Sequence, residues 1–227
     1  MVPPSVVVFD VNETLADLTG LRPRFEAVGA PGRLLETWFA SVLRDGFALT
    51  TAGGYADFKT IAIATLRSML AGMEGEGLRR EPAEAAEYVV AGFPELELHP
   101  DVAAGMARLR EADLRLVTLT NGGAETTKAL LERGGVADLV EQQLSVSEVR
   151  RWKPAREAYV LAAERCSSRV EEMAFVAVHP WDIDGAKRAG LAGAWLNRAD
   201  APYPEFFEKP DFVAPDLGTL SERLLGA

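Results

Sequence analysis

The first strongly patterned stretch of the chain is an apolar run at residues 6–9 that ends at Asp10. Its length and β-branched composition predict a buried strand. Small polar residues follow Asp10, as in a turn. Ligands bind beyond the carboxyl ends of the strands of an open parallel sheet, so Asp10 would stand at the floor of a ligand site. The structural alternative for this carboxylate is to cap the next segment.

Residues 17–94 have a helical pattern and no convincing strand. Apolar residues recur at helical spacing within 34–43 and again within 55–70. A third helix is predicted at 82–92, with Pro82 in a position suited to the first turn. We interpret this block as an inserted helical cap, and we expect most of its aromatic side chains to pack among the helices.

From residue 100 onward, helix and strand patterns alternate, which predicts an α/β fold built on a parallel sheet. The predicted strands are 114–119, 139–144, 173–178, 193–196 and an edge strand at 212–214. The predicted helices are 101–112, 124–133, 155–165, 183–189 and 217–225. His99, just before this region, is interpreted as a solvated loop residue.

The net charge of -10, without clustered Lys and Arg, argues against a nucleic-acid partner but permits a small anionic substrate beside a local cation. The single cysteine, Cys166, excludes an intramolecular disulfide and favours a reducing compartment. The first residues lack the profile of a signal peptide, and no apolar run approaches the length of a membrane span. We therefore expect a cytoplasmic protein with no membrane partner. The oligomeric state is left open, with a homodimer as one possible assembly.

Four consecutive predicted strand ends carry reactive or binding residues. Asp10 follows the first strand, Thr120-Asn121-Gly122 follows the second, Lys153 lies beyond the third and Asp182 beyond the fourth. The later three have structural alternatives, namely a turn, a solvated surface lysine and a helix cap. Parallel strands end at one edge of a sheet, so the coincidence at four ends favours one shared site.

These residues resemble the motifs of the haloacid dehalogenase superfamily, and the resemblance covers nearly the whole chain. The matching motifs, in order, are Asp10-x-x-x-Thr14-Leu15, Thr120-Asn121-Gly122, Lys153-Pro154, and residues 182–186 followed by Ala189-Gly190. The resemblance implies a doubly wound parallel sheet with a Rossmann-like catalytic core, residues 1–16 and 95–227, and a helical cap, residues 17–94. It also implies that Asp10 is a nucleophile.

Two positions separate the phosphatases of this superfamily from its dehalogenases. The phosphatases carry an acidic proton donor two residues after the nucleophile, where this chain has Asn12, which cannot donate and recover a proton in that way. Their fourth motif supplies a carboxylate that helps to hold Mg²⁺, and Val178 stands at that position. Both differences favour a reaction without a metal ion or other cofactor.

The preferred hypothesis is a metal-independent hydrolase that cleaves the carbon–halogen bond of short 2-haloalkanoic acids through an aspartyl ester. Asp10 would attack the halogen-bearing carbon, and Lys153 would keep Asp10 ionised. His179 and Asp182 would lie near the water that cleaves the ester, with His179 able to act as the base. The predicted substrate-binding residues are Asn12, Thr14, Thr120, Asn121 and Tyr159. Lys153 with Tyr159, and Trp181 with Asp182, also resemble elements of the L-2-haloacid dehalogenases.

The chain departs from the best-known L-2-haloacid dehalogenases at three places. They have Tyr at the position of Asn12, an arginine after the cap tryptophan where Phe39 follows Trp38, and Ser-Ser-Asn in place of residues 177–179. Arg44, the nearest arginine of that helix, should point to a different side. These departures indicate a rebuilt site and leave two alternatives open: a Mg²⁺-dependent phosphomonoesterase, and a non-catalytic protein with this fold that binds a small carboxylate.

Overall fold

The computed structural model describes residues 4–73 and 77–226. Within these residues, six strands form one parallel sheet in the order β3-β2-β1-β4-β5-β6. The strands are β1 (Val6–Phe9), β2 (Arg115–Thr120), β3 (Gln142–Ser145), β4 (Met173–Ala177), β5 (Ala192–Leu196) and β6 (Phe212–Ala214). The predicted α/β class and doubly wound parallel sheet are confirmed.

Strand β1 lies in the middle of the sheet because every one of its side chains is apolar and fully buried. Its neighbours are β2 and β4, with Val8 opposite Val117 on one side and opposite Phe175 on the other. The strand order reverses between β1 and β4. Ligands bind at such switch points, so the loops after β1 and β4 are the expected place for a site.

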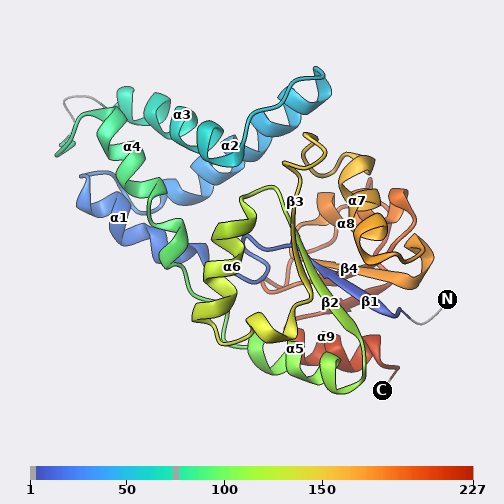
Figure 1. The fold of residues 1–227 in the computed structure, drawn as a ribbon. Coiled ribbons are helices and arrows are strands. Elements are labelled where there is room, and N and C mark those ends of the chain that lie inside the picture. The colour runs from blue at the N-terminus through green and yellow to red at the C-terminus, as the bar shows by residue number, and fades with distance from the viewer. Residues whose placement is uncertain (1–3, 74–76, 227) are drawn as a thin grey trace.

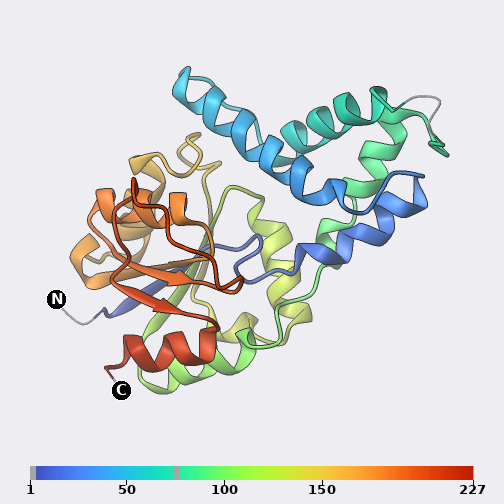
Figure 2. The ribbon, with the colours of Figure 1, turned by 180° about the vertical axis from the view of Figure 1, so that it is seen from behind.

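Helices cover both faces of the sheet (Figures 1 and 2). On the face to which Val7 and Phe9 point, the core is completed by α5 (Val102–Glu111) and α9 (Leu217–Leu224). On the other face, α7 (Arg156–Cys166) and α8 (Pro180–Ala189) pack against Val6 and Val8. The remaining core elements are α6 (Ala124–Arg133) beside β3 and the short 3-10 helices η3 (Ala137–Leu139) and η4 (Val170–Glu172).

Between β1 and α5 the described chain is entirely helical in its regular structure, which confirms the helical character predicted there. The elements are η1 (Leu18–Leu21), α1 (Arg22–Ala27), α2 (Leu34–Thr51), α3 (Phe58–Ala71), α4 (Pro82–Val90) and η2 (Phe93–Glu95). Helices α1 to α4 form one group at the side of the molecule away from the two termini (Figure 1). Residues 74–76 of the predicted cap lie outside the described residues.

Aromatic packing holds this group of helices together. Trp38 of α2 is fully buried, and its indole N–H donates to the carbonyl oxygen of Ala62 in α3 at 2.9 Å. Phe25 and Phe93 meet the Trp38 ring edge-on, at centroid distances of 5.6 and 6.1 Å. The prediction that most aromatic side chains of this region are core residues is confirmed for Trp38, Phe39 and Phe58, which are buried. No helix in the described ranges is both long enough and apolar enough to span a membrane.

Some predicted boundaries are wrong. Helix α3 begins at Phe58 rather than near residue 55, because the Asp57 side chain caps it by accepting from the Thr60 amide at 2.8 Å. Strand β3 begins at Gln142, since residues 137–139 form a 3-10 turn. Helix α8 begins at Pro180, three residues before the predicted start, because proline suits the first turn.

The prediction that His99 is a solvated loop residue is also wrong. The chain returns from the helical group alongside the loop after β1, where the His99 amide donates to the Leu15 carbonyl oxygen at 2.9 Å. The ring is half-buried, and its Nε2 lies 3.0 Å from the Glu13 carbonyl oxygen. Burial lowers the pKa of His99. The residue therefore supports the loop that follows β1.

The loop before Lys153 is tied to the helical group. The Trp152 amide donates to Thr50 Oγ1 at 3.2 Å, and its indole N–H donates to the Ala56 carbonyl oxygen at 3.0 Å. The Trp152 ring stacks on Phe58 at a centroid distance of 5.9 Å. Helix α2 reaches this ring through Gly46, where a Cβ atom would lie 2.4 Å from the indole. Glycine at this position permits the close contact between helix and loop.

We expect Gly46→Ala to reduce the free energy of unfolding by about 1–3 kcal/mol, because the added methyl group must push the Trp152 ring away. Urea denaturation measures the change. The control is Gly72→Ala, where a Cβ atom would meet its nearest neighbour at 3.4 Å and the backbone φ is an ordinary -70°. Equal stability of Gly46→Ala and the unsubstituted protein would contradict this account of the contact.

Candidate active site

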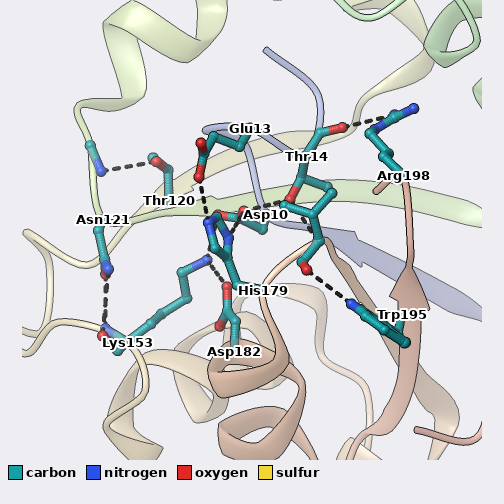
Figure 3. Close-up of polar contacts among 12 residues, drawn as sticks. Asp10, Glu13, Thr14, Thr120, Asn121, Lys153, His179, Asp182, Trp195 and Arg198 are labelled. Carbon is teal, nitrogen blue, oxygen red and sulfur yellow. Dashed lines mark hydrogen bonds and ion pairs between the residues drawn. The ribbon is translucent and has the colours of Figure 1, made fainter. Parts of the chain in front are cut away.

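Asp10 stands at the switch point of the sheet, directly after β1, and only 5% of its surface is exposed. Its amide donates to the Val176 carbonyl oxygen of β4 at 2.9 Å. Its carboxylate oxygen Oδ2 accepts a hydrogen bond from Thr14 Oγ1 at 2.6 Å, and Thr14 Oγ1 in turn accepts from the Val178 amide at 3.1 Å. Thr14 therefore fixes the orientation of the Asp10 carboxylate against the loop after β4 (Figure 3).

Lys153 is completely buried and lies between two carboxylates. Its Nζ is 2.8 Å from Asp10 Oδ1 and 2.7 Å from Asp182 Oδ2. The hydroxyl of Tyr159 donates to Asp182 Oδ1 at 2.5 Å. The alternative of a solvated surface lysine is therefore wrong. So is that of Asp182 as a helix cap, since Asp182 lies inside the first turn of α8 with its side chain buried.

The charges of this cluster stabilise one another. Burial alone would raise the pKa of Asp10, but the positive charges of Lys153 and His179 hold it well below its usual range. Burial likewise opposes the charged form of Lys153, yet the two carboxylates raise its pKa. Burial, together with the charge of Asp10, raises the pKa of Asp182, although Lys153 and Tyr159 donate to it. Asp10 is therefore an ionised carboxylate at neutral pH.

The loop after β2 holds the backbone of Lys153. Asn121 Oδ1 accepts from the Lys153 amide at 2.8 Å, and Asn121 Nδ2 donates to the Lys153 carbonyl oxygen at 3.4 Å. Thr120 Oγ1 accepts from the Gly122 amide at 2.9 Å, which closes the turn. This loop is a turn, as its structural alternative proposed. Its Asn121 side chain also connects the end of β2 to the segment after β3 that carries Lys153. The substrate-binding roles of Thr120 and Asn121 stay predictions.

His179, the residue before α8, faces both Asp10 and a residue to which the sequence analysis gave no role, Glu13. Its Nε2 lies 2.7 Å from Glu13 Oε2, and its Nδ1 lies 3.5 Å from Asp10 Oδ2. Nδ1 has no hydrogen-bond partner among the described residues. Burial alone would lower the pKa of His179, but its close contacts with the Asp10 and Glu13 carboxylates raise it to about 9.

Glu13 reaches His179 through a backbone conformation that is uncommon for residues other than glycine, with φ of 64°. Residues in such conformations cluster at functional sites. A carboxylate three residues after the nucleophile and a lone histidine after β4 are both visible in the sequence. Because both follow strands that flank the switch point, their pairing could have been inferred. Arg198 was also missed; it donates to the Thr14 carbonyl oxygen at 3.1 Å, and no sequence signal marked it.

Aromatic rings from the helical group and from α8 beside the sheet pack around the His179 imidazole. The Phe39 ring of α2 and the Trp181 ring of α8 lie 6.3 and 5.1 Å from it, centroid to centroid. Phe39, at the position where the resembled enzymes have an arginine, is buried. Arg44 points elsewhere, as its spacing predicted, since its side chain is 70% exposed and pairs with Asp45. The cations that face Asp10 in the described structure are thus Lys153 and His179.

Beside the cluster lies a cavity of about 310 Å³ between the helical group and the sheet. Asn12, Thr120 and Asn121 line the part nearest to Asp10. Phe58 and Phe93 form the opposite, apolar wall. Tyr159 does not line it, because its ring is fully buried behind Asp182. Its geometry supports Asp182 rather than contact with a ligand, and its predicted role in substrate binding is not tested.

The family model of the haloacid dehalogenase-like hydrolases matches residues 4–190. The chain belongs to this family. It is 28% identical over 227 residues to (S)-2-haloacid dehalogenase 1 of Pseudomonas sp. (strain CBS-3), covering 99% of this chain and 98% of that protein.

Two solved structures are similar to this chain along nearly its whole length. This haloacid dehalogenase-like hydrolase is 27% identical to the L-2-haloacid dehalogenase from Xanthobacter autotrophicus, with a TM-score of 0.85 over 98% of this chain and 99% of that one. A second structure of that enzyme has chloropropionic acid covalently bound; its identity is 26%, its TM-score is 0.85, and the same shares of the two chains are covered. The predicted membership of the superfamily is confirmed.

The donor set around the nucleophile of this hydrolase is poorly suited to a divalent cation. Mg²⁺ requires oxygen ligands and favours carboxylates, but Lys153 and the protonated His179 already present positive charge to Asp10. Within residues 4–73 and 77–226, no group of three or more His, Cys, Asp or Glu side chains is arranged to hold a metal ion. Without a metal ion, the positive charges of Lys153 and His179 already nearly balance the carboxylates of this cluster.

The pKa of His179 predicts a dependence of stability on pH. The folded state raises this pKa from 6.5 to about 9, so the stabilisation is fully present below pH 6.5 and is lost as the pH rises through 9. A shift of that size corresponds to about 3 kcal/mol. The difference in unfolding free energy between the unsubstituted protein and His179→Gln should therefore narrow by about that amount between about pH 6 and about pH 10.

Urea denaturation at a series of pH values tests this prediction. His99→Gln is the matched control, because the pKa of His99 is lowered by burial, and its contribution should stay constant above its unfolded value of 6.5. A difference for His179→Gln that does not change with pH would show that Asp10 and Glu13 do not hold a proton on this ring.

Proposed function

We propose that this chain is a metal-independent hydrolase that cleaves the carbon–halogen bond of 2-haloalkanoic acids through an ester on Asp10. The observation that carries the proposal is a buried, ionised Asp10 paired with Lys153 at 2.8 Å, with an amide, Asn12, where a phosphatase needs an acid. The relative named (S)-2-haloacid dehalogenase 1, which matches along its whole length, supports both the reaction and the (S) configuration of the substrate.

In the first step an Asp10 carboxylate oxygen attacks C2 of the substrate from the side opposite the halogen. The new C–O bond forms as the carbon–halogen bond breaks, and the halide leaves with the electron pair, so no proton donor is required. Lys153 keeps Asp10 ionised and attracts the anionic substrate. We assign the substrate carboxylate to the polar end of the cavity, beside Asn12, Thr120 and Asn121.

In the second step water attacks Cγ of the Asp10 ester. The bond from Cγ to the former Asp10 oxygen, now attached to C2, breaks, and the proton removed from water passes to that oxygen. This step releases a 2-hydroxy acid and restores the Asp10 carboxylate. We assign the base to His179 Nδ1, which lies 3.5 Å from Asp10 Oδ2 and has no hydrogen-bond partner among the described residues. Glu13 holds the other ring nitrogen at 2.7 Å and thereby orients the ring.

The two steps require opposite protonation states of His179, and the charge of Asp10 links them. Before the reaction, ionised Asp10 helps to keep the ring protonated. Esterification removes that negative charge, so the pKa of His179 falls and its proton is released to solvent before the ring accepts one from water. Asp182 is assigned to hold Lys153 in place throughout, through the 2.7 Å contact with Nζ.

We also propose that residues 17–94 act as a cap over a catalytic core of residues 1–16 and 95–227. Support comes from Phe39 of α2, whose ring packs near His179, and from Phe58 of α3, which lines the cavity. A cap in this position excludes water during the first step, which keeps the carboxylate nucleophile poorly solvated. The cytoplasmic location expected from the sequence, and the homodimer, stay predictions.

The alternatives make different predictions. A Mg²⁺-dependent phosphatase would need an acid for the leaving alkoxide, but Asn12 cannot provide one, and Val178 offers no carboxylate for the metal. A non-catalytic carboxylate-binding protein would not need an ionised carboxylate at Asp10, because its negative charge repels an anion. The geometry therefore favours the dehalogenase.

The test is halide release from (S)-2-bromopropanoate. We expect turnover that EDTA does not change, and a loss of about 10³-fold or more in kcat for Asp10→Asn, because an amide is not a nucleophile. Asp138→Asn, at an exposed position, is the control and should be fully active. Hydrolysis of p-nitrophenyl phosphate that EDTA abolishes, without halide release from 2-bromopropanoate, would establish the phosphatase instead.

A further inference from the structure

The cavity beside Asp10 is larger than a short haloacid requires. Its volume is about 310 Å³, which equals the lower end of the range, about 300–1,000 Å³, that is typical of pockets for drug-sized ligands. Water has a volume share of about 30 Å³ in the liquid, so the cavity has room for about ten water-sized groups, more than the heavy atoms of a two- or three-carbon haloacid. The excess lies away from the Asp10 carboxylate, toward the helical group.

The far wall of this cavity is suited to an apolar group. Phe58 and Phe93 are mostly buried and pack edge to face at a centroid distance of 5.2 Å, with Val90 beside them and Leu130 of α6 on the sheet side. Aromatic pairs of this kind bind flat apolar groups through area and ring geometry. Filling such a wall removes apolar surface from water and favours a ligand with an apolar substituent.

The near wall is polar and close to the nucleophile. Asn12, Thr120 and Asn121 line it, and Gly122 adds no side chain there: a Cβ atom on Gly122 would lie 3.2 Å from Thr120 Oγ1 and 3.9 Å from Asn12 Nδ2. The cavity therefore runs from polar groups beside Asp10 to an apolar end. Asp10, His179 and Phe39 do not line it, so the cavity begins beside the nucleophile and lies apart from the proposed hydrolytic side of Asp10.

We propose that this cavity holds the substituent on C2 of the substrate, and that the enzyme accepts 2-haloacids whose substituent is as large as a butyl or benzyl group. The inference rests on the proposed function and adds its substrate class. An acid bound with its carboxylate at the polar wall and C2 at Asp10 would direct such a substituent toward Phe58 and Phe93. Val11 and Asn12, the two residues after Asp10, line the cavity, so it starts directly beside the nucleophile.

The test compares kcat/KM for halide release from 2-bromopropanoate, 2-bromohexanoate and 2-bromo-3-phenylpropanoate. With the unsubstituted protein we expect kcat/KM for the two larger acids to be equal to or above that for 2-bromopropanoate. Thr126→Phe places a ring in the cavity from α6 and should lower kcat/KM for the larger acids about tenfold or more, while 2-bromopropanoate changes less than about twofold.

Lys128→Phe is the matched control, since it adds the same ring to the same helix at an exposed position outside the cavity. It should leave all three values unchanged. Ala91→Leu adds a smaller side chain to the cavity from an exposed position at the end of α4. It provides a second test if Thr126→Phe does not fold. Thermal unfolding of each variant checks that it is folded.

The outcomes separate the two proposals. Turnover of 2-bromopropanoate with kcat/KM for the larger acids about 100-fold lower would overturn the substrate class and leave the proposed function standing. An equal loss of kcat/KM for all three acids in both cavity variants, if they are folded, would also overturn the substrate class. No halide from 2-bromopropanoate would overturn the proposed function, and this inference with it.

Discussion

The burial of Lys153 between Asp10 and Asp182 is the interaction on which the rest of the site depends. An ammonium group with no exposed surface is tolerated only where opposite charge is in direct contact, and here both carboxylates lie within 2.8 Å of Nζ. The same contacts join the loops after β1, β3 and β4. The same ion pairs therefore keep the proposed nucleophile ionised and hold together the chain segments that follow these three strands.

A second cation completes this balance. His179 brings a protonated ring to Asp10, and Glu13 supports it from the other side. The buried pair of Asp10 and Asp182 is therefore offset by Lys153 and His179, and Glu13 lies at the partly exposed margin. Phe39 closes this region with a ring instead of a charge. The functional consequence is that a change in the charge of Asp10 alters the proton affinity of His179, which connects the two proposed chemical steps.

Much of this arrangement follows from the sequence pattern. Short runs of apolar residues identify β1, β2 and β4. Because parallel strands end at one edge of the sheet, Asp10, Thr120 and Asp182 are then expected at that edge. Lys153 lies well beyond the end of its predicted strand, so its place at that edge rested also on the order of the motifs. What the pattern could not show depends on tertiary geometry: Glu13 meets His179 across 166 residues through a positive φ, and Arg198 donates to the Thr14 carbonyl oxygen from the loop after β5. The start of α3 at Phe58 depends on the Asp57 cap, and that of α8 at Pro180 depends on a proline in the first turn. Neither follows from the spacing of apolar residues.

The central claim is that Asp10, and not water, forms the first bond to the substrate carbon. A single turnover in H₂¹⁸O with enzyme in excess over (S)-2-bromopropanoate tests it most directly, with mass analysis of the product and of the peptide that contains Asp10. The account predicts one ¹⁸O atom in the Asp10 carboxylate and an unlabelled hydroxyl group in the 2-hydroxypropanoate released. An ¹⁸O label in the product hydroxyl group, with none in the Asp10 peptide, would mean that water attacks C2 directly and would contradict it.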